Sequence, residues 1–147
     1  MAKRKRMNKA TCPVARALDV IGDRWSLLIV RDAFNGVSRF SEFQASLGVA
    51  RNVLASRLKA MVEEGVLEVE PASDGTAYQQ YVLTPKGQTL FPVIVGLRQW
   101  AEGNLFDRGE RRSRLVERQS GRPVARLEMS SADGRPLAFS EVMVVDK

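Results

Sequence analysis

The sequence contains no histidine and only one cysteine, Cys12. The absence of histidine excludes imidazole bases, Ser-His-Asp triads and histidine-ligated metal sites. A single cysteine cannot form an intrachain disulfide framework or a cysteine-rich zinc site. The sequence also has no phosphate-binding loop and no cluster of metal-ligating residues. We therefore expect no bound metal, no cofactor and no enzymatic activity.

Long apolar runs are absent as well. No segment approaches the roughly 20 consecutive apolar residues that a membrane-spanning helix needs. The basic start "MAKRKRMNKA" is not followed by an apolar run of signal-peptide length. We therefore expect a cytoplasmic protein without a membrane partner. With 147 residues, 44% hydrophobic and 27% charged, the composition suits one globular domain with or without a small extension.

The positive charge is concentrated in the first part of the chain. The net charge is +6, and the isoelectric point is near 10.0. Residues 1–60 contain 12 lysines and arginines against 4 acidic residues, a net +8, whereas residues 61–147 contain 11 against 13, a net −2. This excess suits a polyanionic partner, whose binding face should come mainly from the first 60 residues.

The order of predicted elements is that of a winged helix-turn-helix. Hydrophobic spacing and capping residues predict helices, a two-stranded hairpin around the turn "ASDGT", and a long fifth helix that begins at Thr84-Pro85. The predicted helices lie near 13–21, 24–34, 41–47, 49–64 and 85–105, and the strands near 66–71 and 78–83. The predicted fold class is therefore mainly α with a small β-hairpin wing, plus a small strand-rich C-terminal extension.

Three regions differ in character along the chain. Residues 1–11 form a basic arm, residues 12–107 the winged-helix and dimerisation domain, and residues 108–147 an extension. The extension holds an imperfect repeat, "GRPVA" at 121–125 and "GRPLA" at 134–138. Gly-Arg-Pro is typical of a turn, so we expect short strands such as "RLVERQ", "ARLEM" and "EVMVV" around it.

The stretch "LGVARNVLASRLKAM" at 47–61 has one apolar face and one small, polar face. Leu54, Leu58 and Met61 fall on the apolar side at helical spacing. Most polar helix faces are simply solvated. After a glycine turn, however, such a face fits the major groove, because arginine pairs with guanine or phosphate and asparagine with adenine. The residues assigned to the major groove are Arg51, Asn52, Ala55, Ser56 and Lys59.

Other basic residues have two open interpretations. Arg39 and Arg57 are as well explained by structural ion pairs as by phosphate contacts. The arm residues Lys3, Arg4, Lys5 and Arg6 either bind DNA or only solubilise the chain.

The predicted fifth helix carries more apolar residues than a small wing can cover. A second subunit is therefore their expected neighbour, with Trp100 as a buried anchor. The apolar positions are Leu90, Val93, Ile94, Leu97, Trp100, Ala101 and Leu105.

The motifs resemble those of the HxlR family of bacterial transcriptional regulators, which are dimeric winged-helix relatives of the MarR group. The similarity extends over about residues 12–106 and includes "CPV", "IGDRW", "ARNVL" followed by "RL", "GVL" before the hairpin and "LTPKG" after it. It implies a recognition helix from about Val49, a wing at 66–83, and a dimer interface of the first and fifth helices. Val14 and Leu18 would join that interface.

Two departures from the family pattern matter. The wing tip carries Asp74 and no positive charge, so minor-groove insertion is not expected, although Thr76, Gln79 and Gln80 can bond phosphates. Some members have a cysteine-rich extension, whereas this extension has no cysteine, so no metal is inferred from the resemblance.

Cys12 has two interpretations. A lone cysteine is commonly a small buried residue. Here it precedes Pro13 at a helix start, where the helix dipole favours a thiolate, and the resemblance implies a redox-sensing cysteine at this position.

The sequence thus predicts a homodimeric, sequence-specific DNA-binding transcriptional regulator, more a repressor than an activator. Its partner would be a pseudo-palindromic double-stranded operator. It would respond to redox signals through Cys12 or to a small molecule held in the dimer cleft. The alternative is a winged-helix protein-interaction adaptor without specific DNA binding.

Overall fold

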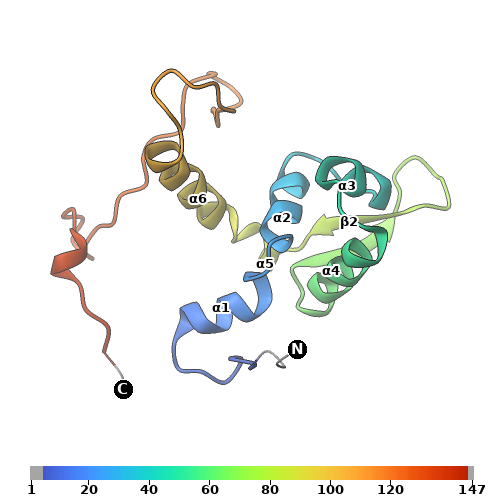
Figure 1. The fold of residues 1–147 in the computed structure, drawn as a ribbon, viewed down its shortest axis with the longest axis horizontal. Coiled ribbons are helices and arrows are strands. Elements are labelled where there is room, and N and C mark those ends of the chain that lie inside the picture. The colour runs from blue at the N-terminus through green and yellow to red at the C-terminus, as the bar shows by residue number, and fades with distance from the viewer. Residues whose placement is uncertain (1–4, 146–147) are drawn as a thin grey trace. The chain divides into compact units, whose positions relative to one another are not determined.

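The computed structural model describes residues 5–145, and it is mainly helical with one two-stranded antiparallel sheet (Figure 1). The predicted winged helix-turn-helix is confirmed. Lys3 and Arg4 lie outside the described residues. In chain order the elements are α1 Pro13–Ile21, α2 Ser26–Phe34, α3 Phe40–Leu47, α4 Arg51–Glu63, β1 Leu67–Pro71, β2 Gln79–Leu83, α5 Pro85–Gln88, α6 Phe91–Asn104 and the 3₁₀ turn η1 Phe139–Glu141.

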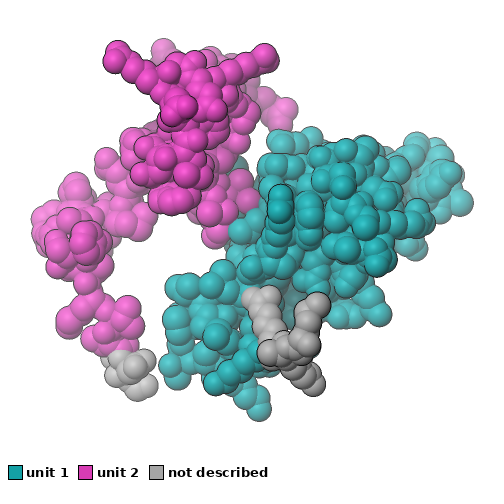
Figure 2. Space-filling model, viewed as in Figure 1, with its two compact units in different colours: residues 1–91 teal, residues 92–147 magenta. Residues whose placement is uncertain are grey.

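The chain divides into two compact units, one ending at Phe91 and the other beginning at Pro92 (Figure 2). In the first unit, helices α1 to α4 and the hairpin supply the hydrophobic core. The second unit contains α6 from Pro92 onward together with the extension. The predicted boundary at residue 107 rests on sequence character and stays a prediction. The largest fully buried apolar side chains are Phe43, Ile29, Leu54, Leu58, Met61, Leu67 and Val30.

The turn between α3 and α4 depends on Gly48. This residue has a φ of 60°, in the left-handed region that glycine enters without steric cost, and its N–H donates to the carbonyl of Gln44 at 2.9 Å. The short turn directs α4 across α3, and Leu54, Leu58 and Met61 are buried as predicted.

The segment "LTPKG", at the end of β2 and the start of α5, is hydrogen-bonded to the C-terminal end of α4. The predicted Thr84 cap is confirmed, because its hydroxyl accepts the N–H of Gly87 at 3.0 Å. The Lys86 ammonium donates to the carbonyl of Glu64 at 2.6 Å. A cation at this position also favours the C-terminal end of the α4 dipole.

Gly87 is required by close backbone approach. A Cβ at this position would lie 2.1 Å from the carbonyl oxygen of Val66. Gly87→Ala should therefore lower the free energy of unfolding by about 1–3 kcal/mol through overpacking. The control is Gly103→Ala in α6, where a Cβ would meet nothing within 4 Å. It should stabilise the chain by up to about 1 kcal/mol, and chemical denaturation of both variants distinguishes these effects.

The prediction of one long fifth helix is wrong. The segment forms two helices, α5 and α6, with a break at Thr89 and Leu90. Pro92 explains the break. Its ring would clash with the carbonyl four residues earlier, and it has no N–H for a helical bond, so it is tolerated only in a first turn.

The extension forms turns rather than the strands that we expected. Between residues 108 and 145 the pairing is limited to two isolated bridges, Val116 with Pro123 and Ser130 with Pro136. The turns lie just before the Gly-Arg-Pro segments, at 118–120 and 132–133, and Gly121 and Gly134 follow them with φ values of 69° and 85°. The prolines of both segments take part in the two bridges. A two-stranded pairing with so little buried surface does not extend into a stable sheet.

Among the described residues, no helix is both long and apolar enough to cross a membrane.

Candidate nucleic-acid interface

Helix α4 presents its predicted polar face to solvent. Its buried residues Leu54, Leu58 and Met61 hold the opposite face in the core of the first unit. The face therefore combines a fixed backbone with small and basic side chains. Its exposed members are Arg51, Asn52, Ala55, Ser56 and Lys59.

The N-terminus of α4 lacks the features that usually stabilise the start of a helix. Of the described side chains, none caps this end: the N-cap residue is Ala50, and the first turn contains no acidic residue. Instead the helix begins with Arg51, a cation at the positive end of the dipole, which is locally unfavourable. Free N–H groups together with an arginine make this end suitable for a phosphate.

A groove of about 720 Å³ lies between the wing and the first residues of α3 and α4. It brings together three of the predicted contact residues, Arg39, Arg51 and Gln79, from three separate segments. Ser41 and Tyr78 also line it and were not predicted as contacts. The groove opens beside the α4 N-terminus and is edged by two guanidinium groups, which suits a phosphodiester backbone.

Two aromatic rings support the arginines of this groove. The guanidinium carbon of Arg51 lies 5.0 Å from the ring centroid of Phe40, and that of Arg39 lies 5.6 Å from the ring of Tyr78. Cation–π contacts of this kind orient a guanidinium without removing its charge. Sequence reasoning missed both contacts, because Phe40 and Tyr78 reach Arg51 and Arg39 only through the fold.

Arg39 is also paired with the wing tip. Its guanidinium bonds the carboxylate of Asp74, and both side chains are part-exposed. Hydrogen bonds from the backbone N–H and hydroxyl of Thr76, with the Arg39 charge, lower the pKa of Asp74 to about 2. Asp74 is therefore ionised near neutral pH and offsets the charge of Arg39 at the edge of the groove.

Arg57 lies in an ion pair, which was one of its two predicted roles. Its Nη1 is 3.4 Å from Oδ1 of Asp23, and about a third of its side chain is exposed (33%). Asp23 also accepts the N–H groups of Trp25 and Ser26, at 2.9 and 3.0 Å, at the start of α2. Burial raises the pKa of Asp23, but the bonds from Ser26 and Trp25 and the Arg57 charge outweigh it, so the pKa is lowered. The pair joins α4 to the residues just ahead of α2.

The remaining predicted contacts are placed differently. Gln80 is already hydrogen-bonded, because its amide donates to Glu70 and Pro71 in the hairpin and accepts from Ser38 ahead of α3. Thr76 donates its hydroxyl to Asp74 at 2.8 Å. Lys5 and Arg6 are exposed ahead of α1. The arm's role in DNA binding stays a prediction.

The predicted dimer residues fall into two groups. Val14 and Leu18 on α1 and Val93, Leu97, Trp100 and Leu105 are exposed, with Trp100 at 60%. Leu90, by contrast, lines a cavity of about 180 Å³ in the first unit beside α1. Ile94 and Ala101 are half-buried. The apolar side chain that α6 does bury is Val95. Cys12, immediately before α1, is exposed with a free thiol.

Comparisons with known proteins agree with this architecture. The sequence profile described as HxlR-like helix-turn-helix matches residues 20–108. An HTH-type transcriptional regulator of Mycobacterium tuberculosis is 45% identical over 89 residues, covering 60% of this chain and 56% of that relative. This chain therefore spans a little over half the length of that mycobacterial relative.

Solved structures extend the similarity. The crystal structure of PA1607, described as a candidate transcription factor, is 53% identical with a TM-score of 0.92, covering 97% of this chain and 100% of that one. The redox regulator HypR in its reduced form is 28% identical with a TM-score of 0.59, covering 64% of this chain and 94% of that one. The PA1607 structure thus matches the extension as well as the helix-turn-helix.

Proposed function

This chain belongs to the HxlR-like helix-turn-helix family, and from that membership we propose that it is a homodimeric, sequence-specific DNA-binding transcriptional regulator. The observation that carries the proposal is the α4 N-terminus, uncapped by any described side chain and carrying Arg51 beside the groove under the wing. This arrangement makes the start of α4 less stable but leaves it positively charged and accessible. Such local conflicts are expected at functional sites.

In the proposed complex α4 enters the major groove. Arg51 and Asn52, in its first turn, would reach base edges, while Ala55 permits close approach of the backbone. Ser56 and Lys59 would bond bases or phosphates farther along the helix. The groove edged by Arg39 and Gln79 would receive the phosphate backbone, and Thr76 would lie beside it on the wing.

A fluorescence titration with random duplex DNA tests the proposal at its most general level. A DNA-binding protein should bind random duplex with an affinity that falls steeply as salt rises, because neutralised phosphates release counterions. The adaptor alternative predicts no salt-steep binding. Absence of binding at low salt would therefore favour the adaptor alternative. If the protein binds, selection of bound sequences from a random pool would identify its operator.

Asp74→Asn should tighten binding to random duplex. The substitution removes a negative charge from the wing tip and releases Arg39 from its ion pair, so one more phosphate can be neutralised. The slope of log affinity against log salt should then steepen by about 0.9. The matched control is Asp133→Asn in the extension, which has the same charge change at another exposed turn. Equal effects of both substitutions would show that only total charge matters.

We further propose that Cys12 makes the regulator sensitive to oxidants. Its thiol is exposed before α1, and one of the solved relatives is described as a redox regulator. Two Cys12 thiols from two chains would lose two protons and two electrons to diamide, which is reduced to its hydrazine, and would form one interchain disulfide.

Diamide treatment should shift operator affinity by about 5–150-fold in the wild type, the usual range for coupled sites. A disulfide-linked dimer should also be visible on a non-reducing gel. Cys12→Ser should show neither change. An unchanged affinity of the treated wild type would exclude the thiol route and leave DNA binding intact.

A further inference from the structure

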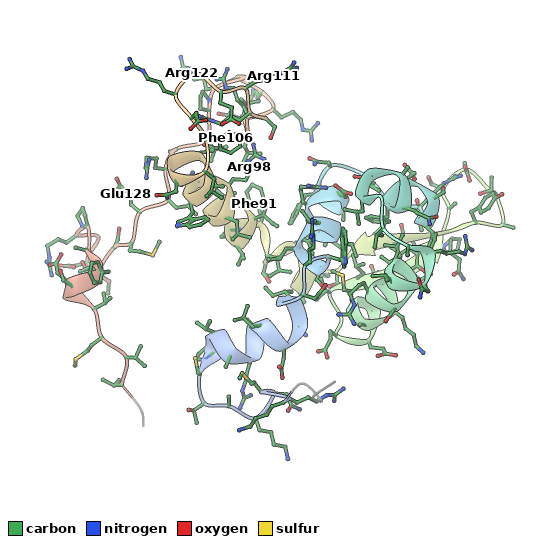
Figure 3. All side chains as sticks on the ribbon, in the orientation of Figure 1. Phe91, Arg98, Phe106, Arg111, Arg122 and Glu128 are labelled. Atoms are coloured by element: carbon green, nitrogen blue, oxygen red, sulfur yellow. The ribbon has the colours of Figure 1, made fainter. Side chains whose placement is uncertain are left out.

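The second unit contains a cavity that the DNA-binding proposal does not use. Its volume is about 360 Å³, and it lies between α6 and the first part of the extension. This size falls in the range of small-molecule sites, about 300–1,000 Å³. Figure 3 labels one of its lining residues, Arg98 on α6, and also Arg111 on the extension loop, which does not line the cavity.

Side chains of α6 fix the cavity walls by binding the extension backbone. Gln99 donates to the carbonyl of Ala125 at 3.0 Å and accepts the N–H of Leu127 at 2.8 Å. Arg98 donates to the carbonyl of Ser113 at 2.9 Å. The extension is therefore attached to α6 on both sides of the cavity, which favours a preformed site over a gap between mobile segments.

The charge of the cavity is positive. Arg98, Arg112 and Arg114 line it against one carboxylate, Glu102, whose oxygen lies 3.9 Å from Arg98. Among residues 5–145, neither Arg112 nor Arg114 has an ion-pair partner. The Nε of Arg98 is buried and has no acceptor within the described part of the chain. A buried donor without an acceptor is costly in a native protein. An anion in the cavity would offset the charge of this guanidinium and would bond the N–H groups of Arg112 and Arg114.

Part of the cavity wall is apolar. Val95, the buried residue of α6, lines the cavity together with Leu115 and Val124 of the extension. A wall of this kind gives no advantage to a fully hydrated inorganic ion. It favours a ligand that has an anionic head and a hydrocarbon body.

We propose that this cavity binds a small organic anion with a carboxylate head and an apolar body. The planar guanidinium fork matches the two oxygens of a carboxylate, and the side chains of Val95, Leu115 and Val124 would cover the hydrocarbon. The site lies within one chain and does not depend on the proposed DNA binding, because its occupancy is measured on the protein alone.

The test uses the full-length chain and three probes. Octanoate carries the proposed head and body, octylammonium carries the same body with a cationic head, and inorganic phosphate carries charge without an apolar body. Titration calorimetry gives affinity, and the Nε–Hε resonance of Arg98 reports binding at this site. Octanoate should bind saturably and shift that resonance, whereas octylammonium should not, and phosphate should bind more weakly.

A pair of charge-matched variants separates the site from general electrostatics. Arg112→Gln with Arg114→Gln should weaken octanoate binding at least about tenfold. Arg108→Gln with Arg111→Gln removes the same charge from neighbouring positions that do not line the cavity and should change it less than about twofold. Thermal unfolding of both variants checks that the fold is retained.

Several results would overturn the proposal. Equal losses of octanoate affinity in the two double variants would show that only long-range charge, and not this cavity, attracts the anion. If octylammonium bound as tightly as octanoate, the carboxylate head would not be recognised. If phosphate bound as tightly, the apolar wall would contribute nothing to binding. The absence of saturable octanoate binding, or of a shift at Arg98, would exclude the site.

Discussion

Replacing Arg51 and Asn52 together with alanine should weaken operator binding by about a hundredfold or more, since each good base contact is worth about 1–3 kcal/mol. Both residues lie in the exposed first turn of α4. Arg51 is held over the ring of Phe40 and lines the groove under the wing. The double substitution removes the guanidinium and the amide while keeping a good helix former at both positions.

The measurement compares the selected operator with random duplex at several salt concentrations. Loss of base contacts should reduce the ratio between operator and random affinity, whereas loss of a phosphate contact should weaken both about equally and flatten the salt slope. Single variants would then assign each role. Asn52→Ala should lower specificity. Arg51→Ala should lower specificity, overall affinity for DNA, or both.

A control with the same chemical change is Arg118→Ala with Gln119→Ala in the extension, where both side chains are exposed. This pair should leave operator affinity within about twofold, because it lies outside the proposed interface and its charge is screened at physiological salt. If the α4 variant also bound its operator as tightly as wild type, α4 would not be the recognition helix. Operator binding would then have to depend on another element of the chain.

Helix α4 and its exposed polar face could be predicted because their signals are local. Leu54, Leu58 and Met61 repeat at helical spacing, and Gly48 sits where the backbone needs a positive φ. The hairpin was equally readable from strand alternation on both sides of a turn sequence. Each of these features depends on residues within one or two turns of one another.

The partner of Arg39 could not be predicted in the same way. Asp74 lies 35 residues away in the sequence, and only the packing of the wing against α3 brings the two together. An arginine at a helix start is equally consistent with a phosphate contact, so the sequence left both roles open. The cavity between α6 and the extension was missed for the same reason, because Arg98 and Arg114 meet only in the folded unit.

The two errors of fold have local explanations. Pro92 was a sufficient signal for a new helix start, but the continuous apolar stripe masked it. The extension has alternating residues around its Gly-Arg-Pro turns, yet strands also need a third strand or a buried face. Phe139, Met143 and Val144 are almost fully exposed, so nothing within the described chain supplies that face.

Leu97→Glu with Trp100→Glu should dissociate the proposed dimer. Both side chains lie on the exposed side of α6, where they are 47% and 60% exposed, while Val95 is buried in the chain itself. A buried aromatic anchor in an interface contributes about 2 kcal/mol or more, and two carboxylates placed opposite their symmetry mates would repel. Sedimentation velocity should therefore show a monomer at concentrations where the wild type is a dimer.

Operator binding should fall with the dimer. Two recognition helices on a two-fold axis engage half-sites about 34 Å apart, and a monomer loses the advantage of the second contact. Circular dichroism should be unchanged, because both residues are already exposed in the single chain. Gln119→Glu with Ser140→Glu adds the same charge at exposed positions and should remain dimeric. A charged α6 variant that stayed dimeric would place the interface elsewhere, whereas a monomer with full operator affinity would contradict cooperative binding of two half-sites.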